Sequence, residues 1–125
     1  MRKKQEIKRL AKEINLNFGE KDLMVTLAYS EIVEKAVLDT EVKSFIRRIK
    51  KHNKNMKYIY TTREIAPLHH NIIMSNVDKE LILKNWSNGR IKIIEIKQIE
   101  ELGEELARYL ISEKNIYVRH VQIYR

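Results

Sequence analysis

Pro67-Leu-His-His-Asn-Ile-Ile-Met-Ser-Asn76 is the stretch around which the rest of the chain is organised. An apolar run with a proline before it and polar residues after it predicts a buried β-strand. Alternate side chains of a strand share a face, so His69 and Asn71 should point to one side and His70 to the other. Such a pair on a rigid strand can bind a small cation or a phosphate. A strand end at which polar side chains reach water explains the same pattern.

The composition of the chain predicts one globular domain, residues 1–125, with an anionic partner. Lys and Arg number 25 and Asp and Glu number 17, which gives a formal net charge of +8. This surplus favours nucleic acid as the partner, although a small interaction protein can be equally basic. The absence of cysteine excludes disulfides, zinc-thiolate sites and thiol catalysis. We find no membrane-spanning run and no secretory signal, so we expect a cytoplasmic protein without a membrane partner.

The spacing of apolar residues predicts alternating helices and strands. Helices are expected over residues 2–15, 30–52, 76–86 and 98–113. Strands are expected over residues 23–29, 56–62, 67–76 and 91–96, and more weakly over 115–125. A break in the second helix suggests a fresh N-cap at Asp39 or Thr40, and Asp78 or Asn76 would cap the third helix.

The order of these elements predicts the fold class. After one leading helix the order is β-α-β-β-α-β-α, and its first six elements have the split βαβ order of a ferredoxin-like or RNA-recognition fold. We therefore expect an α+β protein with an antiparallel sheet of four to five strands and helices packed on it.

Six short segments in this order resemble motifs of the HUH endonucleases, in particular the rolling-circle replication initiators of phages and plasmids. The resemblance runs from about Phe18 to Asn115. The segments are residues 17–29 (first motif), 45–49 (basic helix), 57–59 (the following strand), 68–75 (the His-hydrophobic-His motif), 86–93 (Trp-x-x-Gly-Arg turn and strand) and 106–110 (tyrosine helix). The chain departs from the family at Asn71, where a second histidine is usual, and at Ser112, where a lysine is usual.

The resemblance implies that the protein nicks and rejoins single-stranded DNA by transesterification. Tyr109 would attack a backbone phosphorus and form a 5′-phosphotyrosine, although it also fits as a core aromatic. A divalent ion held by His69, Asn71 and Glu64 would polarise the phosphate, and its oxygen-rich ligands favour Mg²⁺ or Mn²⁺. The expected DNA contacts are Thr26, Tyr29, Arg47, Arg48 and Arg108.

Other functions fit the same sequence. A lapsed initiator, or a module that stacks bases on Tyr29, Tyr58 or Tyr60 without cutting, would also bind single strands. Tyr29 also fits as a core aromatic whose hydroxyl reaches the surface. No Gly-rich loop ending in Lys-Ser/Thr is present, so unwinding and synthesis would need a helicase and a polymerase of the host or the element. A homodimer that supplies a second tyrosine is left open.

Overall fold

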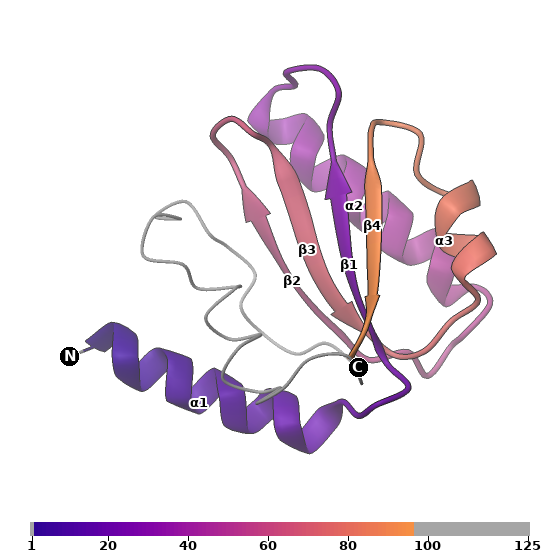
Figure 1. The fold of residues 1–125 in the computed structure, drawn as a ribbon. Helices are drawn as coiled ribbons and strands as arrows, with labels where there is room; N and C mark the ends of the chain where they lie inside the picture. Colours follow the sequence, from indigo (N-terminus) through magenta and orange to yellow (C-terminus); the bar gives the residue numbers. More distant parts are fainter. Residues whose placement is uncertain (1, 97–125) are drawn as a thin grey trace.

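The structure, a computed structural model that describes residues 2–96, contains a four-stranded antiparallel sheet with packed helices (Figure 1). Its elements are α1 (Arg2–Asn17), β1 (Leu23–Ala28), α2 (Lys35–Lys50), β2 (Tyr58–Arg63), β3 (His69–Met74), α3 (Lys79–Lys84) and β4 (Ile91–Glu95). The strand order is β2-β3-β1-β4, and each neighbouring pair is antiparallel. This is the ferredoxin-like arrangement that the order of elements predicts, so the α+β prediction is confirmed.

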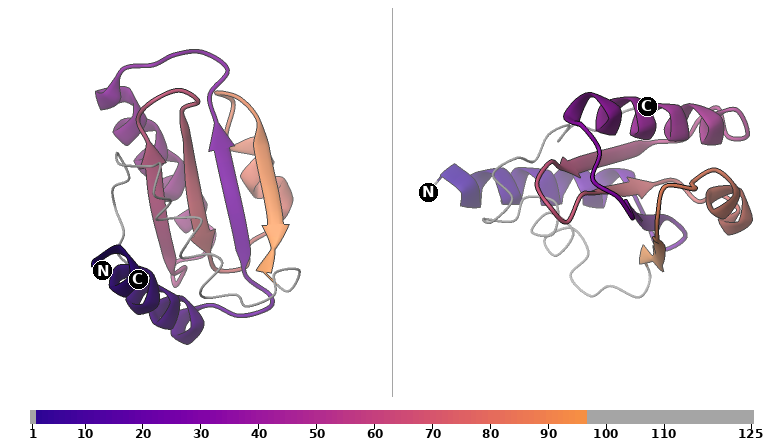
Figure 2. Two further views of the ribbon diagram at one scale, coloured as in Figure 1. Left: turned by 60° about the vertical axis from the view of Figure 1, so that its left-hand side comes forward. Right: turned by 90° about the horizontal axis from the view of Figure 1, so that it is seen from above.

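One face of the sheet, here called the α2 face, packs against α2 and α3 (Figure 2). Leu23, Val25 and Leu27 alternate along β1 and point to this face, where they join Phe45 of α2 and Ile82 of α3. The remaining buried members of this core are Val42, Ile46, Ile49, Met56, Tyr60, Ile72, Met74 and Trp86. The strands therefore present one continuous apolar surface to the two helices.

The opposite face, here called the α1 face, has an apolar half and a polar half. Ile14 of α1 and Phe18, which directly follows α1, pack with three residues at the end of the sheet where β1 begins: Met24, Ile59 and Ile73. Toward the other end the same face carries polar side chains, because the next positions of period two are polar in β1, β2 and β3. α1 therefore packs on the apolar half of this face only, where it forms a second hydrophobic core. The candidate site lies in the polar half.

The helix before β2 differs from its prediction at the N-terminus. α2 begins at Lys35 rather than Ser30. The backbone N–H of Tyr29 donates to the Leu68 carbonyl and that of Ser30 to the Asn88 carbonyl, so this segment is bonded to neighbouring loops instead of opening a helix. No break occurs near residues 38–41, and the Thr40 hydroxyl donates to the Ala36 carbonyl inside the continuous helix.

The helix after β3 lies within its predicted range of 76–86 and has one of the two predicted N-caps. The Asp78 carboxylate accepts a hydrogen bond of 3.0 Å from the backbone N–H of Glu80, which makes Asp78 the N-cap of α3. The predicted helix 98–113 and strand 115–125 lie outside the described residues, as do Arg108, Tyr109 and Ser112. Among residues 2–96 no helix is long and apolar enough to cross a membrane.

Candidate metal centre

His69, the first residue of β3, is held in the tautomer that a metal ligand needs. Its Nδ1 lies 2.9 Å from the carbonyl oxygen of Pro67. A carbonyl can only accept a hydrogen bond, so Nδ1 carries the proton and Nε2 keeps a lone pair. Burial lowers the pKa of His69, and nearby Arg63 lowers it further against the raising effect of the Pro67 bond. The ring is therefore neutral at pH 7, with its other nitrogen oriented by a backbone carbonyl as in many metal sites.

Asn71 supplies an oriented oxygen on the same face. Its side chain is buried, and Thr26, its cross-strand partner on β1, donates a hydroxyl hydrogen bond of 2.9 Å to Asn71 Oδ1. This bond fixes the amide and leaves the oxygen a second lone pair. Because His69 and Asn71 are two residues apart on one strand, they point to the same side of the sheet, as the sequence predicts.

Glu64, the third predicted ligand, takes part in an ion pair. Its carboxylate oxygen Oε2 lies 3.0 Å from the Nζ atom of Lys35, the first residue of α2. This ion pair joins the segment after β2 to the start of α2, and the role of Glu64 as a metal ligand stays a prediction from the resemblance. Within residues 2–96 no three His, Cys, Asp or Glu side chains gather as a metal cluster. On the α1 face His69 and Asn71 thus offer one imidazole nitrogen and one amide oxygen, and waters would have to complete the coordination of a divalent ion there.

His70 belongs to the α2 face and to a separate hydrogen-bond network. It is fully buried, with Nε2 at 2.6 Å from the Tyr29 hydroxyl and Nδ1 at 2.8 Å from the Thr62 hydroxyl. Burial, with smaller effects of Glu41 and Asp39, raises the pKa of Tyr29, so the phenol keeps its proton at neutral pH. The rings of Tyr29 and His70 also meet Trp86 edge to face. Tyr29 therefore packs against the core of the α2 face, and its contact with DNA stays a prediction from the resemblance.

We expect Tyr29→Phe to destabilise the protein by about 1–3 kcal/mol, because it leaves a buried nitrogen of His70 without its partner. Urea unfolding would measure this as a lower midpoint. The pair His69 and Asn71 lies on the opposite face, so metal affinity should be unchanged at temperatures where the variant is folded. An unfolding midpoint equal to that of the wild type would show that the network contributes no stability.

The arginines predicted to contact DNA from the basic helix lie on the wrong side of the sheet for this site. Arg48 ties α2 to the end of α3: its Nη2 donates to the Asn85 carbonyl at 2.7 Å and its Nη1 to the Ser44 hydroxyl at 2.6 Å. Arg47 is exposed on the same helix. Since α2 covers the α2 face, neither arginine shares a surface with His69. Of the predicted DNA contacts within residues 2–96, only Thr26 lies on the α1 face.

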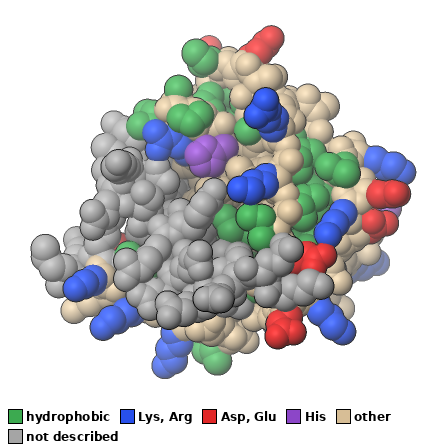
Figure 3. Space-filling view, in the orientation of Figure 1, with side chains coloured by type: hydrophobic (Ala, Val, Ile, Leu, Met, Phe, Trp, Pro, Cys, Tyr) green, Lys and Arg blue, Asp and Glu red, His purple; other side chains and the backbone are tan. Residues whose placement is uncertain are grey.

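Three cations that the sequence analysis did not single out surround the pair instead. Arg63 lies directly across from His69 on β2, and Lys92 lies across from Thr26 on β4. Arg90 is two residues before Lys92, and Ile91 between them packs toward the α2 face, so both cations belong to the α1 face. Figure 3, in the orientation of Figure 1, shows Lys and Arg side chains on both sides of one histidine. The alternation Arg-Ile-Lys-Ile in the sequence indicates that Arg90 and Lys92 share one face of a strand. Only the register of the sheet shows that this face is the one that carries His69 and Asn71.

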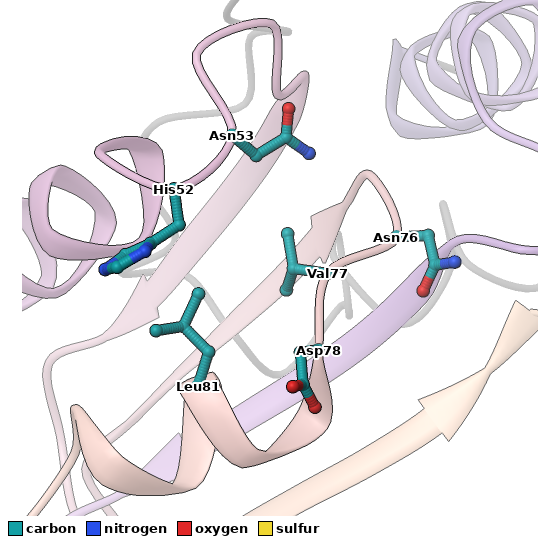
Figure 4. A pocket seen from close by; sticks show the side chains of 6 residues that line it. All are labelled: His52, Asn53, Asn76, Val77, Asp78 and Leu81. Atoms are coloured by element: carbon teal, nitrogen blue, oxygen red, sulfur yellow. The ribbon is translucent and has the colours of Figure 1, made fainter.

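A surface pocket of about 300 Å³ lies away from this pair, between the end of α2 and the start of α3 (Figure 4). It is lined by His52, Asn53, Asn76, Val77, Asp78 and Leu81. Its polar side chains do not converge: in Figure 4 Asn53 lies above Val77 and Asn76 lies to its right, and neither points toward the other. Asp78 is already the cap of α3. The pair on the α1 face is thus the stronger candidate site.

Comparison with known proteins supports the fold. No family model matches the chain, and no curated protein matches it. Among solved structures the chain is similar to the hypothetical protein ORF119 from Sulfolobus islandicus rod-shaped virus 1. The TM-score is 0.65 at 15% sequence identity, and the match covers 88% of this chain and 95% of that one. At this identity the similarity shows a shared fold alone.

Proposed function

We propose that the protein is a replication initiator of the HUH type, which nicks and rejoins single-stranded DNA through a tyrosine with the help of a divalent ion. The observation that carries the proposal is the pairing of His69 and Asn71. The neutral His69 ring has Nδ1 bonded to Pro67, and the Asn71 oxygen is fixed by Thr26 on the same face. Arg63, Arg90 and Lys92 give this face the charge that a phosphate substrate requires.

The proposed reaction exchanges one phosphodiester for another. The phenol oxygen of Tyr109 forms a bond to phosphorus, the bond from phosphorus to the 3′ oxygen breaks, and the phenol proton is lost while the leaving 3′ oxygen gains one. A phenol with a pKa near 10 is a weak nucleophile at neutral pH. His69 Nε2 and Asn71 Oδ1 would hold a Mn²⁺ or Mg²⁺ ion, which would polarise the phosphate. The covalent link conserves the energy of the phosphodiester bond, so the same site rejoins strands without ATP. A polymerase would extend the free 3′-hydroxyl while a helicase unwinds the duplex.

A gel assay with labelled single-stranded DNA and Mn²⁺ tests this function. The wild type should give a protein–DNA band that survives denaturation, and Tyr109→Phe should give none. His69→Ala should lower the yield at least about 100-fold, since loss of even an outer-shell partner typically costs 10–100-fold. His52→Ala removes an exposed histidine far from the pair and should behave as the wild type. An adduct that persists in Tyr109→Phe, or no adduct with either Mn²⁺ or Mg²⁺, would contradict the proposal.

A binding module of the same fold that does not cut is the second candidate. It is favoured by the small ligand set, because Asn71 lies where the HUH endonucleases, which the chain resembles, usually have a histidine. Such a module would not use the tyrosines first considered as a stacking platform. Tyr60 is buried, and Tyr29 and Tyr58 pack against the core of the α2 face. Salt-sensitive binding of single-stranded DNA without any adduct would favour this second candidate.

A further inference from the structure

We propose that Arg90 and Lys92 bind backbone phosphates of the DNA strand that occupies the pair His69 and Asn71. The DNA strand would cross the sheet from β3 over β1 to β4. This inference rests on the proposed function, and it adds the direction of the substrate and two cations that the sequence motifs did not identify.

The register of the sheet defines the path. Asn71, Thr26 and Lys92 lie side by side on β3, β1 and β4. Two residues further along β1, Ala28 lies across from His69, and its backbone N–H donates to the Arg90 carbonyl at 2.9 Å. Neighbouring strands are about 4.8 Å apart, so each cation is anchored about 10 Å from the pair. Thr26 and Ala28 of β1 lie between the pair and the two cations, and their short side chains would not obstruct a DNA strand that crosses β1.

The two cations are available to a ligand. Both side chains are exposed, and among the described residues neither takes part in an ion pair or a side-chain hydrogen bond. The acid of β4, Glu95, is on the other face, where it pairs with Lys79 at 2.7 Å. The α1 face of β4 is therefore basic without a neighbouring carboxylate from its own strand.

Arg63, the third of the cations named above, has a different role, which sets the direction of the path. Arg63 donates from Nε to the Ile65 carbonyl at 3.1 Å and from Nη2 to the Ala66 carbonyl at 3.3 Å. It thereby holds the loop whose next carbonyl, that of Pro67, orients His69. Because the guanidinium on β2 is engaged by this loop, the phosphates beyond the scissile one are assigned to β4.

Salt dependence of binding tests the path without requiring cleavage. Affinity for a labelled oligothymidylate would be measured by fluorescence anisotropy in EDTA over a range of salt concentrations. Each phosphate contact on a single strand contributes about 0.7 to the slope of log Kobs against log salt. The double variant Arg90→Gln with Lys92→Gln should therefore have a slope smaller by about 1.4 in magnitude. The matched control, Arg47→Gln with Lys43→Gln, removes the same two charges from exposed positions of α2 and should change the slope by much less.

The outcomes separate this inference from the function on which it rests. If the control pair reduces the slope as much as the β4 pair, only net charge matters and the path is overturned. The path is also overturned if the wild type forms the tyrosine adduct while the β4 variant keeps the wild-type slope. A reduced slope in the β4 variant without any adduct in the wild type would support the path and reject the cleavage.

Discussion

Gly89→Ala should lower the free energy of unfolding by about 3 kcal/mol. A Cβ atom at this position would lie 2.4 Å from the Ala28 carbonyl oxygen and 2.8 Å from the Ser30 nitrogen. Overpacking costs about 1–3 kcal/mol when neighbouring groups can shift. Here the neighbours are backbone atoms of β1 and its continuation, so the cost should reach the top of this range.

The other described glycine provides the control for this measurement. A Cβ at Gly19 would meet nothing within 4 Å, so Gly19→Ala should change the urea midpoint little. The Ala28 carbonyl also accepts a 3.0 Å hydrogen bond from the Trp86 indole, and Ala28 lies across from His69. A shift of this carbonyl should therefore disturb both the core and the candidate site. Equal midpoints for the two alanine variants would show that the turn adapts without cost.

The fold was predictable because its signals are local. Strand alternation and the short link between β2 and β3 determine a hairpin, and the split βαβ order then leaves few arrangements of the sheet. The start of α2 was not predictable in the same way. Ser30 can begin a helix by its residue type, but its backbone is bonded to Asn88, which is distant in the sequence. Helical periodicity does not report such a bond.

The candidate site was likewise predictable where its features depend on local sequence, and not where they depend on distant contacts. The shared face of His69 and Asn71 follows from their spacing on one strand. The roles of Glu64 and Arg48 depend on partners from other elements, Lys35 and Asn85, and residue type alone does not reveal them. Likewise, the place of Lys92 beside the pair depends on how β4 is aligned with β1. The tyrosine nucleophile stays a prediction from the resemblance, because Tyr109 lies outside the described residues.

Asn71→Asp should make the stability of the protein depend on a divalent ion. The carboxylate would keep the hydrogen bond from the Thr26 hydroxyl but would place a negative charge at a position only 3% exposed. A buried charge without a partner costs several kcal/mol, so we expect a loss of about 3 kcal/mol in metal-free buffer. A carboxylate is also a better ligand than an amide for a hard cation, so the variant should bind Mn²⁺ more tightly than the wild type.

Thermal unfolding in EDTA and in Mn²⁺ measures both effects. At a concentration of 100 times its dissociation constant an ion stabilises the folded state by about 2.7 kcal/mol, so Mn²⁺ should restore most of the lost stability of Asn71→Asp. Adding His69→Ala to this variant should abolish the restoration, because the imidazole is the other ligand. Asn55→Asp adds the same charge at an exposed position and should show neither the loss nor the rescue. A rescue by Mn²⁺ that survives the loss of His69 would mean that the ion binds elsewhere, and that the two side chains on the α1 face do not form a metal site.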